Sequence, residues 1–273
     1  MMSWVKRYPL ITFFVLTYAI GWGCIPFWTF MAGSPFLAAL IVIPLTQGWA
    51  GLRELGSRMI RWRVGWYWYV VTIGLPLAVL LLTAALNVAL GASAPSLAFG
   101  SVSTILLVFA VRLVNPRDGA LGEEPGWRGV ALPGLQSTLS PMVSTLILGV
   151  LVTGWHVPIL FLEEGGLQPS IIVGFLLGSF AVTFFYTWLF NHTGGSVFMS
   201  IVSHSAQGTI QIGALWPAGA DLAQANLLFG VVASAVAIGL VVFDWKSWRG
   251  PAATETTTPQ AMPPRAAAPA TPA

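Results

Sequence analysis

Apolar residues follow one another in runs that are too long for the core of a water-soluble domain. A helix needs roughly 20 residues to cross about 30 Å of hydrocarbon, and about eight runs approach this length. They cover residues 9–31, 34–51, 66–91, 100–114, 141–162, 169–190, 195–216 and 222–243. The pattern predicts an all-α polytopic membrane protein with about eight transmembrane helices.

The composition also indicates that a bilayer is the natural solvent of this chain. Of the 273 residues, 56% are hydrophobic and only 8% are charged, whereas about a quarter of the residues are charged in soluble domains. A soluble globular protein is therefore excluded. The basic residues are spread between apolar runs, so we expect no nucleic-acid partner. The single cysteine, Cys24, excludes a disulfide framework and a thiolate metal site.

The positive charges predict an orientation. With eight spans and both termini in the cytoplasm, all 12 Lys and Arg residues lie on the cytoplasmic side. Residues 50–64 place arginines opposite apolar residues, which predicts an amphipathic helix at the cytoplasmic interface. Residues 250–273 are rich in Pro, Ala and Thr and predict a disordered tail. We therefore expect a plasma-membrane protein with a transmembrane domain over residues 1–249, followed by this tail.

Ionisable residues in or near apolar spans are candidates for function, because burying an unpaired charge is costly. Five stand out, namely Glu123, Glu124 and Arg128 in GEEPGWRG, His156 in TGWHVP and His204 in IVSHSAQG. On a helix, Glu124 and Arg128 are four residues apart and can pair, whereas Glu123 points about 100° away. An unpaired carboxylate in an apolar cleft can act as a general base.

Structural interpretations of these residues stay open. Glu124 and Arg128 can form a salt-bridged helix end, and both histidines can be core residues satisfied by hydrogen bonds. The adjacent Glu163 and Glu164 stand beside two glycines and are typical of a solvated loop. The sequence contains no HExxH, GxSxG, Walker-A or GxGxxG motif, which disfavours zincin, serine-hydrolase and nucleotide-dependent chemistry.

In this order, the five residues resemble the CPBP family of intramembrane proteases, which includes CAAX prenyl endopeptidases and bacteriocin-processing enzymes and is also called the ABI family. The family's first motif, EExxxR, is matched by Glu123, Glu124 and Arg128. The resemblance covers about residues 95–215, and the GWRG and WHVP segments look similar to bacterial members.

The other two motifs match only in their histidines. The second motif, FxxxH, is matched by His156, but Val152 replaces the aromatic residue. The third, HxxxN, is matched by His204, but Gly208 replaces the asparagine. Gln207 or Gln211 are candidates for the missing amide, since a helix would place Gln211 on the face of His204.

The resemblance implies hydrolysis of peptide bonds inside the membrane. It implies that Glu123 is the general base with His156 as its partner, that His204 stabilises the oxyanion and that Arg128 positions the glutamates. Whether Glu123, His156 and His204 also hold a divalent metal such as zinc stays open. For Glu123 to meet His156, which lies about 22 Å into its predicted span, segment 119–140 has to enter the bilayer.

The expected partners are the lipid bilayer and a peptide or membrane-protein substrate. One alternative is a non-catalytic family member that acts as a membrane immunity or scaffold factor, and Gly208 is the feature in its favour. A second alternative is a proton-coupled transporter that uses Glu123 and the histidines as a relay. A transporter is expected to show internal symmetry, which the sequence lacks.

Overall fold

The computed structural model describes residues 2–98, 100–162 and 167–250. Regular secondary structure in these ranges is entirely helical, so the predicted all-α class is confirmed. Glu163, Glu164 and all of the predicted tail except Gly250 lie outside the described residues. The helices are α1 (Met2–Arg7), α2 (Pro9–Gly23), η1 (Ile25–Phe27), α3 (Ser34–Met59), α4 (Trp66–Ala89), α5 (Val102–Val114), α6 (Gly119–Gly126), η2 (Trp127–Ala131), α7 (Leu132–Gln136), α8 (Pro141–His156), α9 (Ile159–Leu162), α10 (Pro169–His192), α11 (Val197–Thr209), α12 (Ile212–Leu215), α13 (Gly219–Phe243) and α14 (Trp245–Arg249).

Within the described part of the chain, six helical segments are long and apolar enough to cross a membrane, which makes this an integral membrane protein. They are Pro9–Phe27, Ser34–Met59, Trp66–Ala89, Pro141–Leu162, Pro169–His192 and Gly219–Phe243. The two other predicted spans, 100–114 and 195–216, form α5 and α11, with 13 residues each. A helix of that length is about 20 Å long and is shorter than the hydrocarbon layer.

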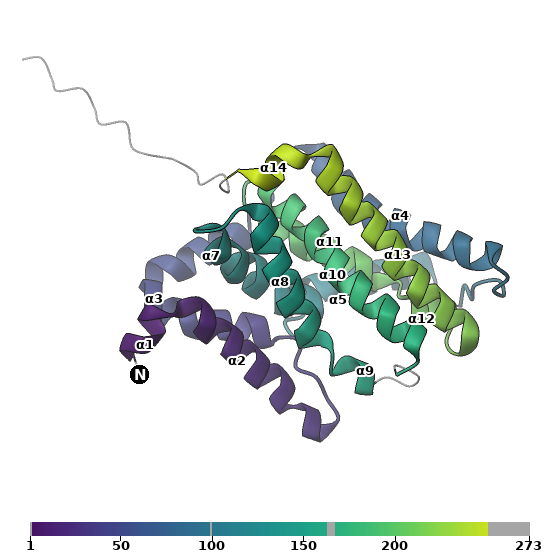
Figure 1. Ribbon diagram of the computed structural model, residues 1–273, viewed down its shortest axis with the longest axis horizontal. Helices are drawn as coiled ribbons and strands as arrows, with labels where there is room; N and C mark the ends of the chain where they lie inside the picture. The colour runs from purple at the N-terminus through teal and green to yellow at the C-terminus, as the bar shows by residue number, and fades with distance from the viewer. Residues whose placement is uncertain (1, 99, 163–166, 251–273) are drawn as a thin grey trace, which may run out of the picture.

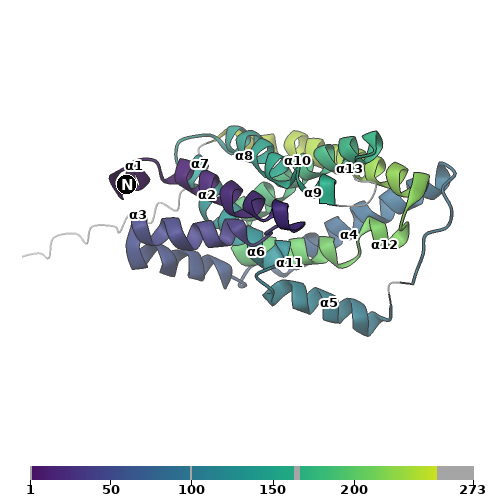
Figure 2. The same ribbon diagram turned by 90° about the horizontal axis from the view of Figure 1, so that it is seen from below.

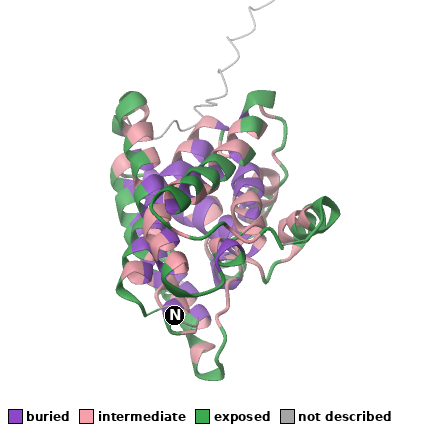
Figure 3. Cartoon of the chain, turned by 90° about the vertical axis from the view of Figure 1, so that its right-hand side faces the viewer, coloured by how far each residue is buried: buried purple, intermediate pink, exposed green. Residues whose placement is uncertain are grey.

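The outer surface of the bundle is apolar, as contact with lipid requires. On α4, Val70 and Leu81 are 61% and 60% exposed, and on α13, Ile238 and Val242 are both 64% exposed. Buried residues gather in the middle of the bundle (Figure 3). Because lipid tails are as apolar as leucine, exposing these side chains costs nothing in a bilayer, whereas it would be unfavourable in water.

Helices α10 and α13 form the most extensive helix pair among the described elements and lie side by side (Figure 1). Their backbones meet at two glycines, because a Cβ on Gly230 would lie 2.5 Å from the carbonyl oxygen of Gly174. Small residues at such contacts let membrane helices approach closely and pack by dispersion forces. This pair supports one wall of the cavity described below.

The amphipathic segment 50–64 forms the second part of α3 and the turn that follows it. Gly48 interrupts α3 with a φ of 65° and a ψ of −156°, a conformation that glycine reaches easily. Beyond this break the helix continues to Met59, and Arg58 pairs with Glu54 at 2.7 Å on the exposed face.

Two elements frame the internal part of the bundle. Helix α5 lies along its edge beside α6 and α11 (Figure 2), and none of its residues is buried. In contrast, residues 119–136 run through the interior as α6, η2 and α7, packed against α3 and α11. The segment thus enters the bundle, as a contact between Glu123 and His156 requires.

Candidate active site

The first motif lies on α6, whose position is fixed at both ends. Asp118 caps the helix, because its carboxylate accepts a hydrogen bond of 3.4 Å from the backbone N–H of Ala120. After Pro125 the chain continues as the π-helix η2, a distortion often found at functional sites. A Cβ on Gly126 would lie 2.5 Å from the carbonyl oxygen of Pro35, so the absence of a side chain brings α6 against α3.

Glu123 lies between α6 and the end of α8. Its Oε2 is 3.5 Å from Nε2 of His156 and accepts a hydrogen bond of 3.2 Å from the indole N–H of Trp127. The residue is only 4% exposed. Its other oxygen, Oε1, faces Gly119, where an added Cβ would lie 2.8 Å from it. Oε2 is therefore held by Trp127 and His156, and Oε1 points towards the space next to Gly119.

Glu124 joins two of the predicted residues. Its carboxylate accepts a hydrogen bond of 2.8 Å from Nδ1 of His204 and lies 3.3 Å from Nη1 of Arg128. Glu124 and Arg128 are 0% and 2% exposed, so this is a buried pair. The expected pairing of Glu124 with Arg128 is present, and the bond to His204 was not predicted. Since a carboxylate only accepts, Nδ1 of His204 is the donor and Nε2 is left to face Gly119, where an added Cβ would lie 2.9 Å from it.

His156 is the last residue of α8. Its Nδ1 donates a hydrogen bond of 2.9 Å to the carbonyl oxygen of Val152, which orients Nε2 towards Glu123. The ring of Trp155 packs edge-on against the imidazole at 4.6 Å between centroids, and Phe30 and Phe175 lie at 6.3 Å. Three aromatic rings therefore surround the imidazole.

Tyr186 of α10 belongs to the site although the sequence did not indicate it. Its ring stacks on His204 at 5.8 Å, the guanidinium of Arg128 lies 4.7 Å from its centroid, and its hydroxyl donates a 2.7 Å hydrogen bond to Gln207. An aromatic residue inside an apolar span can equally face lipid, so the sequence does not distinguish Tyr186 from a lipid-facing residue.

The expectation that Gln211 lies on the helical face of His204 was wrong. Helix α11 ends at Thr209, and Gln211 precedes the separate helix α12, whereas Gln207 lies on α11 three residues after His204. Gln211 still lines the cavity. Helix α11 ends at Thr209 because Ile210 has extended backbone, with a φ of −122° and a ψ of 108°.

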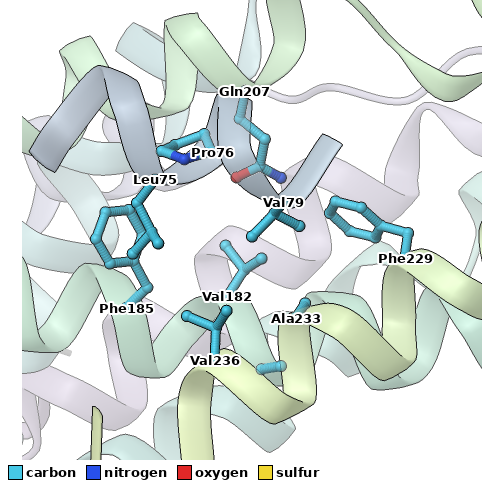
Figure 4. A pocket seen from close by; sticks show the side chains of 10 residues that line it. Leu75, Pro76, Val79, Val182, Phe185, Gln207, Phe229, Ala233 and Val236 are labelled. Carbon is cyan, nitrogen blue, oxygen red and sulfur yellow. The ribbon is translucent and has the colours of Figure 1, made fainter. Parts of the chain in front are cut away.

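Several of these groups line a cavity of about 600 Å³, and Glu123 reaches it through His156, whose Nε2 is 3.5 Å from the Glu123 carboxylate. Its polar end is lined by Arg112, Glu124, Arg128, His156, Tyr186, His204 and Gln207. A small apolar pocket between α4, α10 and α13 adjoins it (Figure 4) and shares Pro76, Val182, Gln207 and Phe229 with it. The cavity therefore joins a charged end to an apolar side, a combination that suits a substrate with a peptide part and an apolar part.

The three residues considered as zinc ligands do not form a metal site. His156 pairs with Glu123, whereas His204 is bound to Glu124, so the two histidines belong to different pairs. No group of three or more His, Cys, Asp or Glu residues in the described ranges is arranged to hold a metal ion. The donors are of types that zinc accepts, but their arrangement in the described residues does not bring three of them to one point, so no chemical step is assigned to a metal.

Neighbouring charges set the ionisation of the two groups that face Gly119, both of which lie on helices outside the six spanning segments. Burial alone would raise the pKa of Glu123, but His156, His204 and the Trp127 hydrogen bond lower this pKa below its ordinary value. Burial and, to a smaller extent, the charge of Arg112 would lower the pKa of His204, but the hydrogen bond that its ring donates to Glu124 and the charges of both glutamates raise this pKa. The site thus favours a charged carboxylate opposite a protonated imidazole.

The segment that carries these residues is similar to known proteins. Residues 101–210 match the family model described as type II CAAX prenyl endopeptidase Rce1-like. A curated relative, CAAX prenyl protease 2 of Methanococcus maripaludis, is 28% identical over 133 residues, which is 46% of this chain and 49% of the relative. The resemblance to the CAAX protease family is confirmed. The alignment spans about half the length of this relative, and the CAAX-protease-like segment contains all five residues predicted from the motifs.

Proposed function

We propose that this CAAX-protease-like protein is an intramembrane endopeptidase that hydrolyses a peptide bond in a membrane-associated or peptide substrate. The observation that carries the proposal is the pair of adjacent glutamates, each paired with a histidine from a different helix, where Glu124 and both histidines line a cavity of about 600 Å³. Buried ionisable groups whose pKa values are shifted by specific partners are typical of catalytic sites.

Glu123 acts as the general base in this proposal. Its Oε1 takes a proton from water, and the water oxygen attacks the carbonyl carbon of the scissile bond. Trp127 and His156 hold Oε2, so the carboxylate cannot rotate away from the water. The same carboxyl group then returns the proton to the leaving amine.

His204 stabilises the negative charge that forms on the carbonyl oxygen. Glu124 fixes the imidazole through Nδ1 and favours its protonated form, which leaves an Nε2–H to donate. Arg128 balances the charge of Glu124 and packs beneath Tyr186, so it positions the glutamate rather than contacting the substrate. A donor aimed at the developing charge in a water-poor cavity is worth far more than the same donor in water.

The test is peptide hydrolysis by the purified full chain in proteoliposomes, with internally quenched peptides of varied sequence, both free and lipid-anchored. Glu123→Gln keeps the shape of the side chain but removes the base, so we expect kcat to fall by on the order of 1,000-fold. Glu54→Gln is the matched control, because Glu54 lies on an exposed face of α3, and it should leave kcat unchanged. Activity should survive a chelator.

A wild-type protein that is folded but cleaves no peptide would favour the non-catalytic alternative, a membrane immunity or scaffold factor. Turnover that persists in Glu123→Gln would instead exclude Glu123 as the base. We also propose a location in the plasma membrane with both termini in the cytoplasm, which rests on the distribution of Lys and Arg.

A further inference from the structure

An arginine occupies the space in which a side chain at position 208 would lie. Gly208 follows His204 by one turn of α11. A Cβ on Gly208 would lie 2.7 Å from Nε of Arg112 and would overlap Cζ and Nη2 of the same guanidinium. No residue with a side chain fits at 208 while Arg112 keeps this position. The glycine therefore makes room for a cation next to the imidazole.

The guanidinium is held in place by Asp118, the residue that caps the start of α6. Nη2 of Arg112 is 3.0 Å from Oδ1 of Asp118, which also caps α6 through the N–H of Ala120. The side chains of Arg112 and Asp118 are 16% and 19% exposed. Arg112 comes from α5, so this ion pair ties the peripheral helix to the one that carries the proposed base.

One donor of this guanidinium has no partner. Nε of Arg112 is buried and makes no hydrogen bond to any group in the described ranges. Buried N–H groups are almost always paired, so an orphaned one at a cavity points to a group supplied by a ligand. Arg112 and Gly208 both line the large cavity, together with His204.

Arg128 is less suited to the same task. Its Nε also lacks a partner among the described groups, but the side chain is only 2% exposed. Its guanidinium already lies against the ring of Tyr186 and beside Glu124. Of the two arginines that line the cavity, Arg112 is the more accessible one, next to His204.

We propose that Arg112 is an oxyanion-binding residue that acts together with His204. This inference rests on the proposed peptidase activity. When the water oxygen bonds to the carbonyl carbon, the π electron pair moves onto the carbonyl oxygen and the water proton goes to Glu123. Nε–H of Arg112 and Nε2–H of His204 donate to that oxygen. The pair then re-forms the double bond, the C–N bond breaks and the amine leaves with the proton.

The first test compares Arg112→Gln with Arg117→Gln, an exposed arginine five residues later on the connection to α6. Removal of one oxyanion donor lowers kcat by on the order of 100-fold in known hydrolases. We expect a loss of that size for Arg112→Gln, with KM changed by less than about threefold, and no loss for Arg117→Gln. An unchanged kcat, or an effect confined to KM, would overturn the inference.

The second test separates catalysis from structural support. Arg112→Ala vacates the space beside Gly208, and adding Gly208→Asn places an amide donor there. If Arg112 donates to the oxyanion, the double variant should recover at least about tenfold of the kcat lost in Arg112→Ala. If Arg112 only anchors α5, the asparagine cannot replace its ion pair with Asp118 and no recovery will follow. This comparison also covers the case in which Arg112→Gln misfolds.

The two proposals fail in different ways. Loss of activity in Glu123→Gln together with full activity in Arg112→Gln overturns only the role of Arg112. A wild-type protein without peptidase activity overturns the proposed function, and the inference about Arg112 with it.

Discussion

The proposed chemistry requires that residue 119 has no side chain, because Gly119 lies between the two reacting groups. An added Cβ would lie 2.8 Å from Oε1 of Glu123 and 2.9 Å from Nε2 of His204, and real Cβ atoms essentially never approach other atoms so closely. The residue begins α6 without a positive φ, so alanine suits the backbone there. A substitution at this position should therefore act on the site and not on the fold.

For Gly119→Ala we expect a loss in kcat of about 10-fold to 100-fold, since small displacements of reacting groups have effects of that size. Thermal unfolding of the variant should stay close to that of the wild type. Gly56→Ala is the control, because no described atom lies within 4 Å of a Cβ at Gly56. Equal kcat values for both variants would show that the space beside Gly119 is not used.

The residues of the site were predictable where spacing alone decides a contact. The distance of four positions between Glu124 and Arg128 brings the two onto one helical face, and they pair as predicted. Arg112 and Tyr186 could not be predicted, because they reach the site from other helices through tertiary packing. Gly208 was noticed as a missing asparagine, but only the structure relates that gap to the arginine beside it.

At the scale of helices, the crossing of α10 and α13 depends on the absence of side chains. A Cβ on Gly230 would lie 2.5 Å from the carbonyl oxygen of Gly174, and a backbone atom cannot move aside as a side chain can. Gly174 and Phe229, next to this contact, line the cavity, so a separation of the helices would also widen the site.

Gly230→Val should destabilise the protein by about 1–3 kcal/mol, as overpacking of a tight contact does. The control is Gly239→Val on the same helix, because a Cβ there meets only Phe243, at 4.0 Å. Both variants carry the same helix propensity, so their difference in melting temperature in detergent reports the crossing alone. If both melt together, the close contact between the two helices contributes nothing measurable.

The membrane-spanning helices were predictable from the apolar runs wherever a long run forms a helix over most of its length. Six runs form helices long enough to span a membrane. The runs at 100–114 and 195–216 form helices of 13 residues, because Ser101 and Ser196 cap their starts and the helices end at Val114 and Thr209. Hydrophobicity counts the apolar residues in a window, but it does not show where a serine caps the start of a helix or where the backbone becomes extended and the helix ends.

At the scale of the whole molecule, a group of basic residues is separated towards one end of the bundle. Basic residues lie on α1, the second part of α3 and α14. Helices α1, α7 and α14 lie towards one end of the long helices, and α9 and α12 towards the other (Figure 1). At the latter end, Asp221 accepts hydrogen bonds from Ser93, at the loop that follows α4.

This separation predicts which end faces the cytoplasm. Positively charged short loops are retained on the cytoplasmic side, so the end with the second part of α3 should be inside and the loop after α4 outside. Single cysteines can test this in a Cys24→Ser background, since Cys24 is the chain's only cysteine. Gly56→Cys and Ala94→Cys introduce reporters at the two ends, and the structure leaves room at both positions.

In right-side-out spheroplasts, a membrane-impermeant maleimide should label Ala94→Cys at once and Gly56→Cys only after the membrane is permeabilised. Both variants need equal expression and equal labelling in detergent, so that a difference reports sidedness and not reactivity. The reverse pattern would place the basic end outside the cell, against the retention of positive charge. It would also exchange the membrane sides on which α5 and α11 begin, at Ser101 and Ser196. A substrate would then reach Glu123 from the other side of the membrane.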